Sequence, residues 1–116
     1  MNAGRDMTYQ GVYLRFFMHA TARHGGMLLY EWILEQAKRE GLAGGSVFRA
    51  IAGFGRHGVL HEEHFFELAG DLPVKVEFIL REPEAERLLE IVRDSGAALV
   101  YARAPTAFGV LEPAPR

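Results

Sequence analysis

The sequence predicts an α+β domain of the ferredoxin-like class, a βαββαβ sandwich with a four-stranded antiparallel sheet and two helices on one face. Three observations predict this class. Four short segments have the apolar patterns of strands, and two longer segments have the periodicity of amphipathic helices. Each helical segment lies between two strand segments, so a β-α-β unit occurs twice. Because crossover connections are right-handed, few other topologies fit this order.

The first β-α-β unit begins at residues 11–18, where apolar and other side chains alternate as in a strand. A helix is predicted over residues 26–40, because apolar residues recur there at helical spacing. Gly41 follows at the position just past the helix end, which favours glycine. Residues 46–53 are mostly apolar and form the predicted second strand.

The second unit begins with residues 73–81, where Val74, Val76, Phe78 and Leu80 alternate with Lys75, Glu77, Ile79 and Arg81. A helix follows from Pro83, because proline is tolerated in the first helical turn. Gly96 ends that helix, and residues 97–103 form the predicted fourth strand. The sequence therefore predicts a ferredoxin-like domain over residues 11–103.

The two ends of the chain have no regular pattern. Residues 1–10 are polar and aperiodic, which indicates a flexible N-terminal arm. Residues 104–116 hold three of the five prolines, which indicates a loose tail.

Composition limits the function classes. The chain has 116 residues and a formal net charge of −2, so it lacks the basic excess typical of proteins that bind nucleic acid. It has no cysteine, which excludes disulfides, thiolate catalysis and thiolate metal ligands. No signal-peptide core and no membrane-spanning stretch is present in the sequence. We therefore expect a cytoplasmic protein that does not insert into a membrane.

The sheet face opposite the helices is predicted to be too apolar for a monomer. Its members are expected to be Tyr13, Phe17, Ile51 and Ile79, together with Arg15, Arg49, Lys75 and Glu77. A large mixed face of this kind favours a subunit interface and hence a homo-oligomer, with a solvated face as the alternative. Arg15 and Glu77 would lie on adjacent strands, which predicts a cross-strand ion pair.

The connection after the second strand is far longer than the two to five residues of a usual hairpin loop. It opens with Gly53, Phe54, Gly55 and Arg56, where glycine-flanked backbone N–H groups could converge on an anion. The signal is weak by itself, since no Walker-type lysine follows.

A second candidate anion site lies before the first helix. Arg23 and His24 precede Gly25 and Gly26, and a helix N-terminus attracts anions. The alternative is that the two glycines form only a turn.

The long connection also holds three histidines, His57, His61 and His64, which could form a metal-binding module. Their spacing is not that of the zinc-protease motif, and a polar loop without metal is the alternative. No catalytic constellation stands out in the sequence. An enzyme of the dimeric α+β-barrel type, with His19, His24 and aromatic residues around an apolar pocket, remains a further alternative.

Several short motifs occur in order along most of the chain. They are Tyr13-Leu14-Arg15, Leu29-Tyr30-Glu31, Gly41-Leu42-Ala43-Gly44, Arg49-x-Ile51-Ala52-Gly53-Phe54-Gly55, His61 and Asp71-Leu72-Pro73-Val74-x-Val76-Glu77. In this order and spacing, the sequence resembles the PII-like bacterial family known as domain of unknown function 190.

The resemblance implies a trimer of ferredoxin-like subunits, related to PII signalling proteins and to CutA-type proteins. It also implies that nucleotides bind in clefts between subunits and that the long loop after the second strand reaches a partner. Family members are often encoded beside a fluoride-channel component, which implies a membrane transporter as partner.

Together these observations favour a non-catalytic, trimeric regulatory protein whose ligand is an adenine nucleotide or another anion. The candidate ligand-binding residues are Arg23, His24, Arg49, Gly53, Phe54, Gly55, Arg56 and His61.

Overall fold

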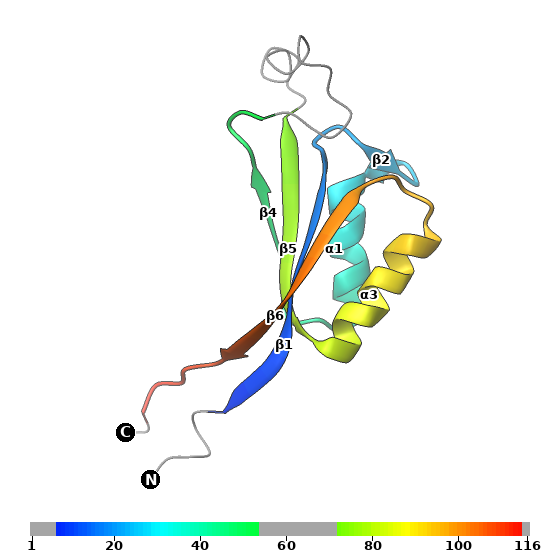
Figure 1. Ribbon diagram of the computed structural model, residues 1–116. Helices are drawn as coiled ribbons and strands as arrows, with labels where there is room; N and C mark the ends of the chain where they lie inside the picture. Colours follow the sequence, from blue (N-terminus) through cyan, green and yellow to red (C-terminus); the bar gives the residue numbers. More distant parts are fainter. Residues whose placement is uncertain (1–6, 54–71, 115–116) are drawn as a thin grey trace.

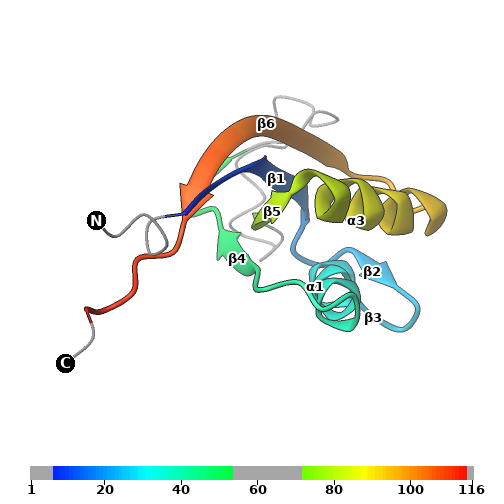
Figure 2. The same ribbon diagram turned by 90° about the horizontal axis from the view of Figure 1, so that it is seen from below.

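The computed structural model describes residues 7–53 and 72–114, which form a sheet with two helices packed on one face (Figures 1 and 2). The sheet contains β1 (Thr8–His19), β4 (Ser46–Arg49), β5 (Pro73–Arg81) and β6 (Val100–Gly109), and the helices are α1 (Leu29–Arg39) and α3 (Glu82–Asp94). The strand order is β4-β5-β1-β6, and all neighbours are antiparallel. The predicted ferredoxin-like fold is therefore confirmed.

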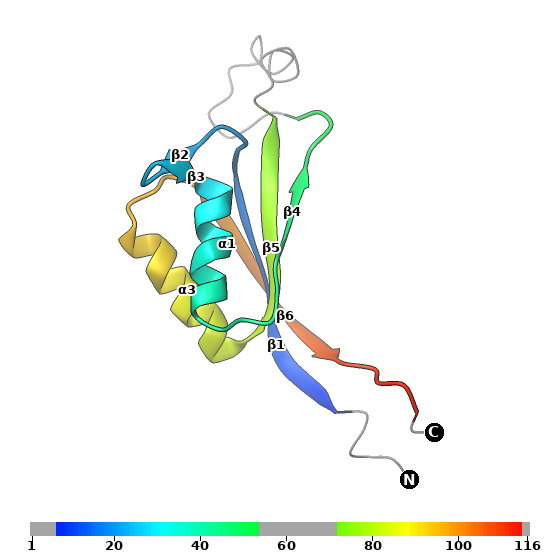
Figure 3. The ribbon, with the colours of Figure 1, turned by 180° about the vertical axis from the view of Figure 1, so that it is seen from behind.

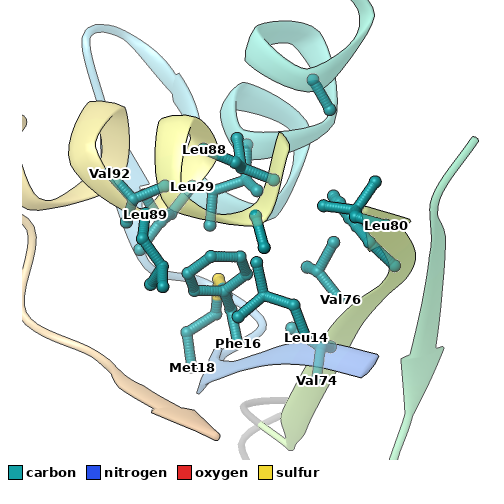
Figure 4. Packing of buried hydrophobic residues seen from close by; sticks show 14 of the residues in the cluster. Leu14, Phe16, Met18, Leu29, Val74, Val76, Leu80, Leu88, Leu89 and Val92 are labelled. Atoms are coloured by element: carbon teal, nitrogen blue, oxygen red, sulfur yellow. The ribbon is translucent and has the colours of Figure 1, made fainter. Parts of the chain in front are cut away.

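The core lies between the sheet and the helices (Figure 4). Leu14 and Phe16 on β1 and Phe78 on β5 are almost fully buried, as is Ile33 on α1. The rings of Phe16 and Phe78 meet edge to face, with centroids 6.3 Å apart. No polar or charged side chain is buried among the described residues. The alternating pattern of the sequence thus directs one side of each central strand into an apolar core.

Local signals fix the helix ends. The Glu84 carboxylate accepts a hydrogen bond from the Arg81 backbone N–H at 2.9 Å, which satisfies a free donor at the start of α3. At the end of α1, Gly41 has a φ of +77°, and its N–H donates to the Lys38 carbonyl. Both ends lie close to the predicted positions.

The first helix starts later than predicted. A short hairpin, β2 (Arg23–His24) and β3 (Met27–Leu28), precedes α1, and Gly25 and Gly26 form its turn with φ values of +59° and +84°. Two successive positive φ angles are typical of a tight hairpin turn, which glycine adopts without strain. The prediction that the helix begins at residue 26 is therefore wrong.

The second strand is shorter and the fourth strand longer than predicted. β4 ends at Arg49 instead of residue 53. Residues 104–109, expected in a loose tail, belong to β6, and residues 8–10, expected in a flexible arm, belong to β1. Pro105 is compatible with β6 because this strand lies at the edge of the sheet.

Candidate functional site

The sheet face away from the helices is the largest candidate interaction surface, and we call it the open face. Directly paired residues of antiparallel strands point to the same side of a sheet, so the register assigns its members. They are Tyr9, Tyr13, Arg15 and Phe17 on β1, Lys75, Glu77, Ile79 and Arg81 on β5, Ser46 and Phe48 on β4, and Val100, Ala102, Ala104, Thr106 and Phe108 on β6.

Three apolar members of the open face are exposed. Ile79 is 52% exposed, Phe48 is 50% exposed and Val100 is 37% exposed. They lie on three different strands, so the apolar character extends across the width of the sheet. An exposed apolar surface that extends across a whole sheet face is typical of an interaction site.

A polar cluster lies among these side chains. Arg15 and Glu77 are direct cross-strand partners, as predicted, but the predicted ion pair between them is absent. The Arg15 guanidinium instead lies over the Tyr13 ring, 4.3 Å from its centroid, and Lys75 Nζ lies 3.0 Å from Glu77 Oε1. The buried Nε of Arg15 has no hydrogen-bond partner. Arg15 therefore has hydrogen-bonding capacity that the protomer leaves unused.

The cluster shifts two pKa values. The hydrogen bond between Tyr13 and the Glu77 carboxylate raises the pKa of Tyr13, because it favours the protonated phenol. Burial alone would raise the pKa of Glu77, but Lys75 and the Tyr13 hydroxyl, aided by the charge of Arg15, outweigh burial and lower it. Glu77 is therefore ionised at neutral pH and Tyr13 is protonated.

The second candidate region is the base of the long connection between β4 and β5. Ala50 N–H donates to the Pro73 carbonyl at 2.9 Å, which fixes the two ends of the connection beside each other. Ala20 N–H donates to the Leu72 carbonyl, also at 2.9 Å, which ties the same point to the end of β1. A β-carbon on Gly53 would lie 3.6 Å from the Pro73 ring, so Gly53 is part of this base.

Arg49 lies at the end of β4 opposite Val74, whose side chain is in the core. The prediction that Arg49 belongs to the open face is therefore wrong, because paired residues share a side of the sheet. Ile51 lies beyond the end of β4 and is 91% exposed, so it is not a member of the paired open face either.

Arg23 and His24 lie in the hairpin before α1 and interact within it. Arg23 donates from Nη2 to the Gly26 carbonyl at 2.9 Å, and the His24 ring meets the Trp32 ring of α1 at 4.5 Å between centroids. The helix begins at Leu29, so Gly25 and Gly26 do not form its N-terminus. The turn interpretation is the one that the structure supports.

The structure thus separates the predicted ligand residues into groups. Arg49 and Gly53 lie at the loop base, whereas Arg23 and His24 lie in the hairpin, and no hydrogen bond or ion pair joins the two groups in the described ranges. The other candidates, Phe54, Gly55, Arg56 and His61, lie outside the described residues, as do His57 and His64.

Residues 7–53 and 72–114 contain neither a candidate metal site nor a membrane-spanning helix. No three potential metal ligands among histidine, aspartate and glutamate come together there. No helix in this part of the chain is long and apolar enough to cross a membrane.

Sequence reasoning missed several members of the open face. Phe48 lies beneath Lys75, with Nζ 5.3 Å from its ring centroid, and Tyr9 and Phe108 stack at 5.5 Å. Only strand register reveals them, because Phe48 lies in a short segment and Phe108 lies beyond Pro105, past the predicted end of the fourth strand. The position of Phe108 on this face could not be predicted, because the sequence alone did not indicate that β6 extends to Gly109.

Comparison with known proteins places this chain in a family. Residues 11–101 match the model of the family DUF190, described as "Uncharacterized ACR". A UPF0166 protein of Aquifex aeolicus is 38% identical over 87 residues, which cover 75% of this chain and 83% of that protein. A UPF0166 protein of Methanocaldococcus jannaschii is 31% identical over 91 residues, with coverage of 75% and 83%.

Solved structures with the same fold are described as PII-like. A PII-like signaling protein from Thermus thermophilus superposes with a TM-score of 0.61 at 14% identity, covering 87% of this chain and 90% of that chain. CPII, a nitrogen regulatory PII-like protein from Thiomonas intermedia bound to ADP, AMP and bicarbonate, superposes with a TM-score of 0.60 at 16% identity, covering 90% and 98%. The chain belongs to the DUF190 family, and its fold is PII-like.

Proposed function

We propose that this protein is a non-catalytic, PII-like regulator that assembles as a homotrimer through the open face. Its ligand is an adenine nucleotide, bound in clefts between subunits near the loop base. The ligand changes the affinity of the long connection for a partner, for which a membrane transporter is the candidate.

The observation that carries the proposal is the shared fold with CPII, whose structure holds ADP, AMP and bicarbonate. This chain combines that fold with a long connection between β4 and β5, and hydrogen bonds fix the base of the connection at Ala50 and Ala20. A ligand bound at this base would contact the residues that anchor the two ends of the connection to the sheet. Ligand binding can shift the connection only through such a differential contact.

Arg49 is the cation that we assign to the nucleotide phosphates. It ends β4 at the loop base and is exposed, and no hydrogen bond or ion pair holds its guanidinium among the described residues. Arginine suits this role because its planar fork can bind phosphate oxygens in pairs. Gly53, which lies further along the same segment, would allow the backbone to approach the ligand closely.

Self-association through the open face is the second element of the proposal. Exposed apolar side chains on three strands surround charged groups that the protomer satisfies only in part, as for Arg15. Binding of a second subunit would remove this apolar surface from water, which stabilises the assembly by roughly 25 cal/mol for each Å² of apolar surface buried.

Isothermal titration calorimetry with ADP, AMP and ATP tests the proposal. We expect the wild-type protein to bind at least one of these nucleotides, and Arg49→Ala to weaken that binding about tenfold or more. Arg39→Ala is the matched control, because Arg39 is an exposed arginine at the far end of α1 that pairs only with Glu35 among the described residues. Absence of binding by all three nucleotides at millimolar concentration would overturn the nucleotide assignment, and equal losses in both variants would overturn the role of Arg49.

The two alternative functions, a metal-binding module and a dimeric enzyme, have separate tests. Metal binding by His57, His61 and His64 stays an alternative, which a zinc or copper titration of the triple alanine variant against the wild type decides. A catalytic dimer with an apolar pocket would require a dimeric mass in solution, whereas the proposed function requires a trimer.

A further inference from the structure

β1 and β6 extend beyond the rest of the sheet. The pairing of β1 with β5 ends at Gly11 and Arg81, but β1 continues to pair with β6 as far as Thr8 and Gly109. Residues 8–10 and 107–109 therefore form a two-stranded extension without a third strand, and we call this extension, together with the adjoining Met7, Val110 and Leu111, the ribbon. It projects past both helices at the end of the molecule where the two termini lie (Figures 1 and 3).

The root of the ribbon is tightly packed. A β-carbon on Gly11 would lie 2.3 Å from the Leu80 carbonyl oxygen and 2.6 Å from Cε1 of Phe108, so glycine lets the Phe108 ring lie against the strand. Phe108 stacks on Tyr9 at 5.5 Å, and the Arg81 guanidinium lies 4.3 Å from the Tyr9 ring centroid. These contacts hold the ribbon in a defined direction relative to the sheet.

The outer part of the ribbon is apolar and exposed. Met7 is 54% exposed, Val110 is 61% exposed and Leu111 is 89% exposed. An isolated two-stranded ribbon is at best marginally stable in water. In the described part of the chain, no side chains cover the exposed residues of the ribbon. The contacts of Gly11, Tyr9 and Phe108 nevertheless hold the ribbon away from the rest of the domain.

The ribbon itself contains no charged residue. Residues 7–14 and 104–111 contain no aspartate, glutamate, lysine or arginine, although charged residues form 24% of the chain. A strand pair without lysine or arginine of its own lacks the cluster of basic side chains with which proteins bind phosphate, nucleic acid or an anionic lipid surface. It suits an apolar protein surface.

Continuity with the open face identifies that surface. Tyr9 and Phe108 lie on the same side of the sheet as Tyr13 and Ile79, so the aromatic side of the ribbon extends the open face beyond the last residues of β5. A copy that covers the open face would also meet the ribbon. We propose that the ribbon is a docking element that packs its apolar side chains against a second copy of this chain, and this inference rests on the proposed self-association.

The test compares two exposed apolar residues at opposite ends of the molecule. Leu111→Ser removes a ribbon side chain that is 89% exposed, and Ile51→Ser is the matched control because Ile51 is 91% exposed. Neither change removes a core contact, so both variants should melt as the wild type does when dissociated. Sedimentation velocity over a dilution series of the full-length proteins measures the dissociation constant of the assembly. We expect Leu111→Ser to raise it about tenfold and Ile51→Ser to leave it within about twofold.

A crosslinking experiment supplies a direct readout. p-Benzoylphenylalanine at position 111 of the purified protein should capture a second copy on illumination, and the same group at position 90, an exposed site on α3, should not. Absence of crosslinking from position 111, or an unchanged dissociation constant for Leu111→Ser in a wild-type protein that assembles, would overturn the role of the ribbon alone. A wild-type protein that stays monomeric at all concentrations would overturn the proposed self-association as well.

Discussion

Replacing Gly11 with alanine should destabilise the protein more than the same change at Gly44 or Gly45. At Gly11 the new β-carbon would lie 2.3 Å from the Leu80 carbonyl oxygen, a backbone atom of the paired strand, and 2.6 Å from the Phe108 ring. That separation must grow to at least 3.0 Å, which moves β1 against β5 at the end of their hydrogen-bonded ladder. Insertion of a methyl group into a packed site of this kind costs about 1–3 kcal/mol.

Gly44 and Gly45 serve as comparisons for Gly11. A β-carbon on Gly45 would meet the Phe78 ring at 3.0 Å, so the ring must move by only a few tenths of an ångström and the cost should lie at the lower end of that range, about 1 kcal/mol. Nothing lies within 4 Å of a β-carbon on Gly44, and its φ is not positive. Alanine there should stabilise the protein by about 0.4–1 kcal/mol, because it restricts the unfolded chain.

Urea unfolding and thermal melting of the three variants, at one protein concentration, provide the assay. A fixed concentration is needed because self-association stabilises by mass action. For a chain of this length, 1 kcal/mol corresponds to about 4 °C in Tm, so Gly11→Ala should melt several degrees below Gly44→Ala. A Gly11→Ala protein as stable as the wild type would refute the close packing at the root of the ribbon.

Three further predictions concern the core and the surface ion pairs. Leu14→Ala should cost about 2–5 kcal/mol in urea unfolding, because Leu14 is fully buried between the sheet and the helices. Glu77→Gln should cost about 0.5 kcal/mol at pH 7, since Glu77 is partly exposed and its ion pair with Lys75 is screened by solvent. The lowered pKa of Glu77 means that its charge stabilises the fold above the unfolded pKa of about 4.3, and that this stabilisation is lost as pH falls through the folded value, so wild type and variant should converge once the pH lies below the folded value. Arg103→Met should cost about 1 kcal/mol or less, with a smaller loss at high salt, because Arg103 bonds to two carboxylates of α3 at 2.8 Å.

Each of these has a contradicting outcome. A loss below about 1 kcal/mol for Leu14→Ala would contradict its placement in the core. A difference between Glu77→Gln and the wild type that grows toward low pH would reverse the sign of the pKa argument. Arg93→Met is the control for Arg103, since Arg93 is an exposed arginine of α3 without a described ion pair; equal effects would show that the bonds of Arg103 contribute nothing specific.

The sheet could be predicted from the sequence wherever one strand alternates clearly. Residues 73–81 were predicted as a strand and β5 has those bounds, because alternate apolar side chains pack on the helices while the intervening ones, Ile79 included, lie on the open face. α3 starts within one residue of its predicted first position, since proline and glutamate side chains mark a helix start.

The boundaries that failed depend on pairing partners instead of local propensity. β4 stops at Arg49 because its partner β5 begins at Pro73, so residues beyond Ala50 have no strand beside them in the described part of the chain. β6 continues to Gly109 because β1 extends to Thr8 and pairs with it. Neither partner length can be read from the segment itself.

The candidate site was predicted in part for the same reason. Tyr13, Phe17, Lys75, Glu77 and Ile79 were placed on the open face correctly from alternation, since both central strands are regular. Assigning Phe48 and Phe108 to that face required the register of the edge strands. The absent Arg15–Glu77 ion pair could not be foreseen from the register. The register brings several possible partners close to each side chain, and the side-chain rotamers determine which of them interact.

Assembly through the open face is the central claim, and a molar mass in solution tests it most directly. Light scattering of the purified wild-type protein, coupled to size exclusion, should give three times the 13.0 kDa chain mass. Ile79→Arg places a charge in the middle of the open face at a residue that is 52% exposed, so the variant should remain folded and give 13.0 kDa. A wild-type mass of 13.0 kDa, or an Ile79→Arg protein that stays assembled, would contradict the account.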